Sequence, residues 1–320
     1  MIKARIIRKI FVTTMTMFIL LTVFSISMLG GKENVLPVIT EVESVYSFNT
    51  NNIYLLNEKG YLVRGKILLD EDSLKDNILK ILNNLTISDT SKFSNKLRGT
   101  IPKDVNVLDV ICGSNLVTVN FSDEFLEVDE TLGKQMIVSI VYSLLDLDRV
   151  EGVSILVDGK VLDCYPNTEE KLPLVLDKSI GINKQYDINS RSDITSVVVY
   201  YLENIEEDMY YVPVTKYLND DREKIKVIVE ELTTSYIYED NLMSFLNSKT
   251  ELIDYKEENN IMFLNFNEYL FDGDDKVLEE VVYSISYSVF DNYEVSMVIF
   301  QVNAKDVCYV ERNKKNEKNT

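Results

Sequence analysis

The chain has 320 residues, of which 46% are hydrophobic and 27% are charged, a composition typical of one large globular domain or two ordinary ones. Acidic residues outnumber basic ones by 52 to 33, and the net charge of −19 excludes nucleic-acid binding through a basic surface. Histidine is absent, which excludes serine–histidine and cysteine–histidine nucleophiles and histidine-ligated metals. Three cysteines are too few for a disulfide-rich scaffold.

The N-terminal region has the pattern of a membrane anchor. Residues 1–9 contain basic but no acidic side chains, and residues 10–29 carry no charge at all. A helix of that length spans about 30 Å of hydrocarbon, and its positive flank stays in the cytoplasm. We therefore predict a cytoplasmic tail at 1–9, a transmembrane signal-anchor at 10–29 and an external spacer at 30–48. A signal peptide cleaved near Ser25 or Ser27 is the alternative.

The external part contains two degenerate copies of one unit, displaced by about 141 to 149 residues. We place the first copy at 49–164 and the second at 195–309. Residues 165–194 between them are rich in polar residues and are predicted to be a linker, in which 172–176 can add an edge strand. Residues 310–320 are polar and predicted to be a disordered tail.

Each copy is predicted to run β-β-α-β-β-α-β, because strand-like runs of β-branched and aromatic residues alternate with apolar stripes at helical spacing. In the first copy these segments are 53–56, 61–69, 74–85, 106–111, 116–121, 132–147 and 153–157. In the second copy they are 196–202, 209–214, 225–232, 251–255, 261–266, 277–290 and 295–302. This order predicts an α+β fold with helices packed on one face of a mixed or antiparallel sheet.

Several single residues mark the two copies. Ser73 is predicted to cap the first helix, and Asp220 or Asp221 the corresponding helix of the second copy. Asn120 is expected to correspond to Asn265, and the pair Tyr142-Ser143 to Tyr283-Ser284.

A tight turn is predicted at Asp158-Gly159, with Gly159 at positive φ. Valine should therefore be tolerated less well there than at Ala304, the approximate counterpart.

These landmarks resemble the GerM domain family of sporulation and spore germination proteins. The residues that carry the resemblance are Thr100-Ile101-Pro102, the run 117–121 with Ser122, the helix 136–147, Val157-Asp158-Gly159-Lys160 and, between the copies, Gly181-Ile182-Asn183. The second copy matches through Leu264-Asn265-Phe266. It departs from the pattern where it lacks a proline corresponding to Pro102 and where Val302-Asn303-Ala304-Lys305 replaces the Asp-Gly turn.

The predicted anchor, the tandem repeat, the lack of catalytic groups and the resemblance together predict a non-enzymatic, membrane-anchored protein. Its two domains would lie outside the membrane, at the cell surface or in the forespore intermembrane space. It would act in sporulation or germination through contacts with other sporulation membrane and assembly proteins, with self-association into a ring or channel-like assembly as a further expectation. The alternative is a receptor that binds cell wall or a small germinant in the groove between the copies.

No residue is predicted to act in catalysis, to bind a cofactor or to bind a metal. Asp272, Asp274 and Asp275 favour helix capping over calcium binding, because Lys276 and Val277 follow at once where a calcium loop needs a later acid. Asp123-Glu124 is interpreted as a solvated turn.

Cysteine and tyrosine each leave two interpretations open. Cys164 and Cys308 are predicted to occupy equivalent positions in the two copies, either as half-buried residues or as a disulfide pair. The tyrosines gathered in the second copy indicate sheet packing or a protein interface; they are Tyr200, Tyr201, Tyr210, Tyr211, Tyr236 and Tyr238.

Overall fold

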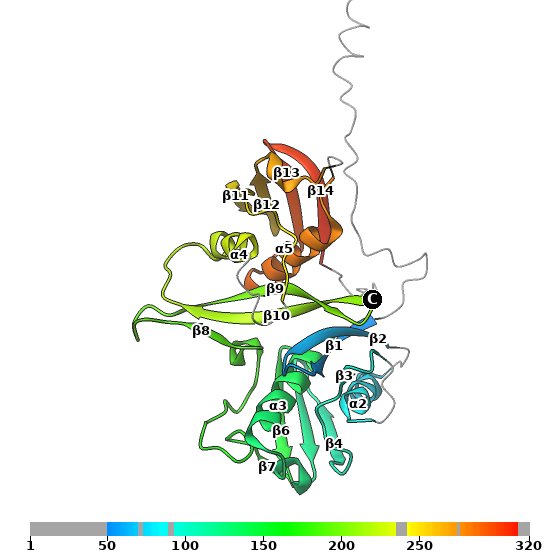
Figure 1. Ribbon diagram of the computed structural model, residues 1–320. Helices are drawn as coiled ribbons and strands as arrows, with labels where there is room; N and C mark the ends of the chain where they lie inside the picture. Colours follow the sequence, from blue (N-terminus) through cyan, green and yellow to red (C-terminus); the bar gives the residue numbers. More distant parts are fainter. Residues whose placement is uncertain (1–49, 70–72, 89–92, 235–241, 274–275, 313–320) are drawn as a thin grey trace, which may run out of the picture. The chain divides into compact units, whose positions relative to one another are not determined.

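The computed structural model describes residues 50–69, 73–88, 93–234, 242–273 and 276–312 (Figure 1). The predicted cytoplasmic tail, the signal-anchor at 10–29 and the spacer lie outside these residues. Among the helices of the described ranges, none is long and apolar enough to cross a membrane. The last strand continues to Glu311, so the polar tail starts slightly later than the predicted residue 310.

Both copies contain the predicted elements in the predicted order. The first copy comprises β1 (Thr50–Asn57), β2 (Leu62–Leu68), α2 (Leu74–Leu85), β3 (Leu97–Arg98), β4 (Val107–Cys112), β5 (Leu116–Phe121), α3 (Glu130–Leu144), β6 (Gly152–Val157) and β7 (Lys160–Val161). The second copy comprises β9 (Thr195–Ile205), β10 (Asp208–Leu218), α4 (Lys224–Thr233), β11 (Leu252–Glu258), β12 (Ile261–Phe266), α5 (Glu279–Asn292), β13 (Met297–Val302) and β14 (Lys305–Glu311).

Each copy builds a four-stranded mixed sheet with the same strand order. The orders are β4-β5-β6-β7 and β11-β12-β13-β14, with the two central strands parallel and the outer pairs antiparallel. A register shift falls at the same place in both, between Val107 and Asp109 and between Leu252 and Asp254. The prediction that the two copies share one fold is therefore confirmed.

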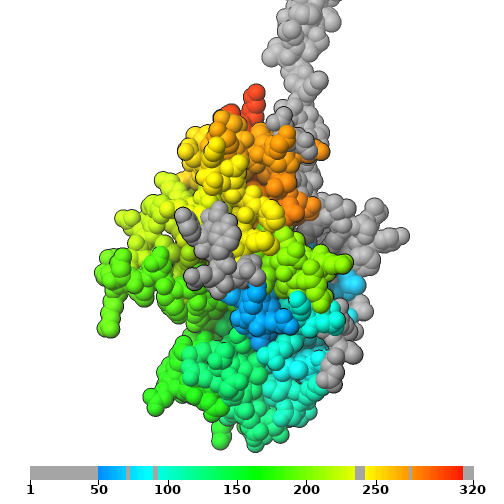
Figure 2. Space-filling view, viewed as in Figure 1, coloured from blue at the N-terminus to red at the C-terminus, as the bar shows by residue number. Residues whose placement is uncertain are grey.

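The two hairpins do not extend these sheets, which corrects the one-sheet arrangement predicted for each copy. They form a third sheet of order β3-β1-β2-β10-β8, in which β9 pairs with the other edge of β10. Tyr211 of β10 pairs with Arg64 of β2, so this sheet runs from one copy into the other. The space-filling view shows the first hairpin (blue) directly against the second (yellow-green) (Figure 2).

This arrangement places the long helices between two sheets. Helix α3 contacts β1 and β6, and α5 contacts β9 and β14 (Figure 1). Every residue of α3 from Met136 to Leu144 is buried, because both sides of the helix face a sheet. The prediction that helices pack on one face of a single sheet therefore does not describe α3 and α5, whose residues are buried on almost all sides.

The N-cap residues mark where the helices begin. Ser73 caps α2 as predicted, and α3 begins earlier than predicted because the Asp129 carboxylate accepts a hydrogen bond from the Leu132 N–H. The predicted cap of α4 is wrong, since the N-cap residue is Glu223. Asp220 instead binds Arg222 at 2.5 Å.

The predicted linker is partly regular. It contains a short 3-10 helix, η2 (Lys178–Ile180), and strand β8 (Gln185–Asp187), which pairs in parallel with Lys216, Tyr217 and Leu218 of β10. The edge strand expected at 172–176 is reduced to one antiparallel bridge between Leu176 and Val153.

Hydrogen bonds set the correspondence between the copies. Asn120 Oδ1 accepts from the Gly159 N–H at 2.9 Å, and Asn265 Oδ1 accepts from the Ala304 N–H at 2.8 Å. Gly159 has φ 75°, as predicted. Ala304 has φ 61°, so the second copy makes the same turn without glycine.

The expected match of Tyr142-Ser143 with Tyr283-Ser284 is wrong. Ser143 Oγ accepts from the Tyr54 N–H at 3.0 Å, and the hydroxyl that does this for the Tyr200 N–H, at 2.9 Å, belongs to Ser288. The pair Tyr142-Ser143 therefore corresponds to Tyr287-Ser288, one helical turn further along α5.

Candidate functional site

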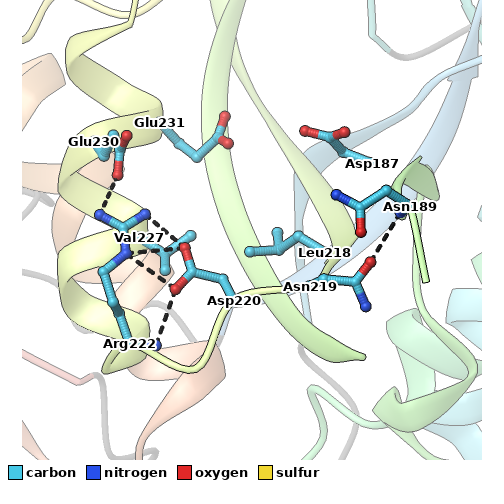
Figure 3. A pocket seen from close by; sticks show the side chains of 9 residues that line it. All are labelled: Asp187, Asn189, Leu218, Asn219, Asp220, Arg222, Val227, Glu230 and Glu231. Carbon is cyan, nitrogen blue, oxygen red and sulfur yellow. Dashed lines mark hydrogen bonds and ion pairs between the residues drawn. The ribbon is translucent and has the colours of Figure 1, made fainter. Parts of the chain in front are cut away.

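A small depression lies between α4 and the end of the shared sheet (Figure 3). Its volume is about 220 Å³. Its floor is apolar, from Leu218 and Val227, and its walls are polar. The polar lining residues are Asp187, Asn189, Asn219, Asp220, Arg222, Glu230 and Glu231.

The charged groups on the helix side of this pocket are paired with one another. Arg222 lies between Asp220 and Glu230, with nitrogen–oxygen distances of 2.5 Å to each carboxylate (Figure 3). Hydrogen bonds from Arg222 lower the pKa of Asp220. Glu231 accepts from Lys216 at 2.5 Å and from the Tyr201 hydroxyl at 3.1 Å. Arg222 thus favours the ionised form of Asp220, and the carboxylate oxygens of this wall present hydrogen-bond acceptors to a ligand.

A second concentration of polar groups joins the two copies. Glu203 of β9 has a side chain only 4% exposed, and its partners come from the turn between β1 and β2. Asn57 Nδ2 donates to it at 2.6 Å and Lys59 Nζ at 2.7 Å. A buried carboxylate is costly without such partners, so Glu203 ties the second copy to the first.

Asp291 of α5 forms a similar contact with η2. Its side chain is 9% exposed, Lys178 Nζ lies 2.5 Å from Oδ1, and the Tyr200 hydroxyl donates to Oδ2 at 2.7 Å. Burial alone would raise the pKa of Asp291, but Lys178 and the Tyr200 hydroxyl favour the ionised form and the net shift is downward. The Tyr142 hydroxyl of the first copy donates to the Lys178 carbonyl at 3.0 Å. Lys178 therefore contacts both copies.

Tyrosines add to the contacts between the copies. Together with the contacts of Glu203, Asp291 and Lys178, they form what we call the joint. The Arg64 guanidinium of β2 lies 3.9 Å from the centre of the Tyr287 ring, a cation–π contact. Tyr211 meets the same ring edge-on at 5.1 Å, and Tyr283 stacks on it at 5.4 Å. Of the tyrosines predicted in the second copy, Tyr211 thus serves an interface within the chain, whereas the Tyr201 hydroxyl binds Glu231 of its own copy. Tyr236 and Tyr238 lie outside the described residues.

The structure brings together few of the other residues singled out by sequence. Asp274 and Asp275 lie outside the described residues, and Asp272 closes a turn by accepting from the Lys276 N–H at 3.0 Å. The N-cap residue of α5 is Leu278, so the predicted capping of this helix by Asp274 is wrong. Within the described ranges, no group of three or more acidic or cysteine residues is arranged to hold a metal ion. Asp123 and Glu124 lie in a short 3-10 helix after β5.

The cysteines are all free thiols, so the disulfide alternative is not realised. Cys308 lies in β14 and pairs with Phe300 of β13, whereas Cys164 lies beyond the end of β7 and forms an isolated antiparallel β-bridge with Lys171. The two positions therefore do not correspond, because β14 continues where β7 stops.

Sequence reasoning missed most of the pocket and of the joint. Asp220 is predicted as a helix cap, and the sequence patterns do not single out Glu203, Arg64 or Lys178. For Arg64 and Glu203 the sequence offers one signal, a charge within an apolar strand, as in Val63-Arg64 and Leu202-Glu203. Such a charge is unusual in a strand buried on both faces.

Comparison with known proteins identifies the fold. A sequence model of the family described as "Germane: Sporulation and spore germination" matches residues 52–163 and 198–308. The spore germination protein GerM of Bacillus subtilis (strain 168) is 24% identical over 272 residues, which cover 82% of this chain and 74% of that protein.

The solved structure of the tandem GerMN domains of the sporulation protein GerM from Bacillus subtilis has the same fold. Its TM-score is 0.74 at 23% identity, over 81% of this chain and 92% of that one. The resemblance drawn from the sequence motifs is thus confirmed. Since the family model matches each copy of the fold and together more than half of the chain, this protein belongs to the Germane family of sporulation and spore germination proteins.

Proposed function

We propose that this chain is a non-enzymatic, membrane-anchored protein that acts in sporulation or germination through contacts with other sporulation membrane and assembly proteins. Residues 10–29 would anchor it, with both domains outside the membrane. The supporting observation is the joint. Glu203 and Arg64 make inter-copy contacts, and Lys178 of the intervening segment contacts Asp291 of the second copy and Tyr142 of the first, so that the two domains form one body. Such a body presents one continuous surface to a partner, as an assembly protein requires.

The proposal is tested by affinity capture of the full-length, tagged protein from membranes of sporulating cells, with bound proteins identified by mass. We expect specific membrane or assembly proteins to be enriched. The matched control is residues 1–48 with the same tag, which keeps the predicted anchor and lacks both domains. Recovery of the same proteins with the control would contradict the proposal.

Membrane anchoring has a separate test. Because the apolar run at 10–29 is long and its cleavage region poor, the protein recovered from membranes should retain its N-terminus. Terminal sequencing and intact mass measure this directly. A mature chain that begins near Ser27 or Gly30 would show cleavage instead.

The pocket favours a second candidate, a receptor for cell wall or a small germinant. It is lined by β8, β10 and α4 and not, as expected from the sequence, by a groove between the two copies. Its carboxylates and the side-chain amide of Asn189 suit a ligand that carries amino and hydroxyl groups. Calorimetric titration of the full chain with muropeptides and amino acids tests it. Binding that is lost in Arg222→Ala, together with capture of wall fragments free of protein partners, would favour the receptor over the assembly protein.

A further inference from the structure

The shared sheet has a gap in its pairing at the boundary between the copies. Strands β2 and β10 are antiparallel neighbours with Arg64 opposite Tyr211, so the same register places Leu62 opposite Pro213. Proline has no N–H to donate, and direct pairing between the two strands stops at that position. The carbonyl of Leu62, a residue 2% exposed, therefore needs a donor from elsewhere.

The side chain of Asn183 fills this gap. Its Oδ1 accepts from the Leu62 N–H at 2.8 Å, and its Nδ2 donates to the Leu62 carbonyl at 2.8 Å and to the Pro213 carbonyl at 2.7 Å. One amide thus meets backbone groups of both copies. Asparagine suits the position because it offers one acceptor and two donors, and because it tolerates the left-handed backbone observed, with φ 46°.

The residues before Asn183 hold the same segment against β10. The Thr215 N–H donates to the Ile182 carbonyl at 2.8 Å, and the Ile182 N–H donates to Thr215 Oγ1 at 2.9 Å. The Ile182 side chain is fully buried. Gly181 has φ 71°, and a Cβ there would lie 2.6 Å from the Tyr217 hydroxyl, so only glycine fits. Beyond Asn183, β8 takes over from β2 as the neighbour of β10.

We infer that residues 181–183 form a connecting segment that holds the two copies in one relative orientation. Asn183 is the positioning residue: its amide supplies the donor to the Leu62 carbonyl that the Pro213 nitrogen cannot supply, and it also binds the Leu62 N–H and the Pro213 carbonyl. Glu203 binds Asn57 and Lys59 at the β1–β2 turn, and Arg64 pairs with Tyr211. Asn183 acts between these contacts, at Leu62 and Pro213. The orientation of the domains is thus set by the segment between them, which sequence composition had marked only as a linker.

The test measures the arrangement of the copies in the full chain, purified in a mild detergent. Spin labels on the exposed Cys112 of the first copy and on Ile253→Cys of the second, with Cys164→Ser, report the distance between the four-stranded sheets. The variant is Asn183→Gly, because glycine removes the amide and adopts positive φ without strain. The matched control is Asn167→Gly: Asn167 also has positive φ, at 56°, and donates to the carbonyls of Leu126 and Val128 within the first copy.

We expect a broader distance distribution in Asn183→Gly and an unchanged one in Asn167→Gly. Amide exchange at Leu62 should become roughly 5- to 30-fold faster in Asn183→Gly only, as expected when buried hydrogen bonds are lost. Asn183→Asp keeps the acceptor and loses both donors, so it should give an intermediate width and remains available if the glycine variant does not fold. A parental distribution in either Asn183 variant would overturn the inference.

Discussion

Ala304 occupies a left-handed backbone position that the first copy gives to glycine. Its φ is 61° and that of Gly159 is 75°, and both N–H groups donate to the asparagine on the neighbouring strand. Left-handed backbone costs a residue with a Cβ roughly 1–2 kcal/mol. The expectation that valine is better tolerated at 304 than at 159 therefore loses its basis, and we expect valine to destabilise both turns.

The first prediction concerns this turn. Ala304→Gly should raise the free energy of unfolding by about 1 kcal/mol, because it removes the left-handed cost, and Gly159→Ala should lower it by a similar amount. No atom lies within 4 Å of a Cβ built at Gly159, so the effect of alanine there is purely conformational. Urea unfolding of the full chain measures both. Equal stability of Ala304→Gly and the parent would show that the turn relaxes.

The second prediction follows from Asp291, whose pKa lies below its ordinary value because of Lys178 and Tyr200, in spite of burial. A carboxyl group whose pKa is lowered by folding stabilises the folded state when it is ionised. For Asp291 this stabilisation is complete above the pKa of the unfolded state, 3.8, and is lost as the pH falls through the pKa of the folded state. The stability of the parent should therefore fall between pH 5 and pH 2 more steeply than that of Asp291→Asn. Parallel pH profiles would mean that Asp291 does not contribute.

At the scale of elements, the long helices protect the open edge of each hairpin. In the second hairpin, α5 supplies partners for the first strand, β9. Ser288 Oγ accepts a hydrogen bond from the Tyr200 N–H. Asn292 accepts from the Val198 N–H at 3.2 Å and donates to the Val198 carbonyl at 2.7 Å. In the first copy Ser143 and Asp146 do the same for β1. Unpaired strand edges promote aggregation, and here helix side chains occupy them.

The third prediction tests this edge. Ser288→Ala should lower the free energy of unfolding by about 1–3 kcal/mol, because the buried Tyr200 N–H loses its acceptor. The control is Ser286→Ala two residues earlier. The Ser286 hydroxyl is buried and has no hydrogen-bond partner among the described residues, so its removal should be neutral or stabilising. Thermal unfolding compares the two, and equal effects would refute the edge role.

Local patterns predicted most elements but not how the hairpins pair. Alternation located β5 and β12 exactly, at 116–121 and 261–266, because every second residue of both strands is buried. Alternation predicts which face of a strand is buried, but it does not predict which other strand pairs with it. The pairing of Arg64 with Tyr211 is set by contacts far apart in sequence, so the shared sheet could not be predicted. The pocket was missed for the same reason, since its walls come from β8, β10 and α4.

At the scale of the whole molecule, the described domains form one body through the joint. Arg64 enters a group of tyrosines of the other copy, and Glu203 receives its two donors from across the boundary. Neither copy alone satisfies these groups. Charges buried at such a boundary favour one arrangement over others, because a displaced copy leaves them without partners.

The fourth prediction quantifies the joint. A double-mutant cycle of Arg64→Ala and Tyr287→Ala should give a coupling energy of about 0.5–2 kcal/mol, as expected for a partly desolvated cation–π contact. The control cycle uses Lys249 and Tyr269, a pair within the second copy whose ring-to-cation distance is 5.5 Å and whose coupling should be smaller. Denaturant unfolding supplies the four free energies. Additive effects of the Arg64 and Tyr287 substitutions would show that the contact carries no energy.

The pairing of Arg64 with Tyr211 also has a consequence for synthesis. At a ribosomal rate of about 5–20 residues per second, roughly 7–30 s pass between the synthesis of these two residues. During that interval the nascent chain displays the outer edge of β2, with Asn57 and Lys59 still lacking the Glu203 carboxylate that completes the native turn. The first copy must therefore wait for the second before it is finished, and a holding chaperone or translocation in an unfolded state would keep that edge from pairing with another chain.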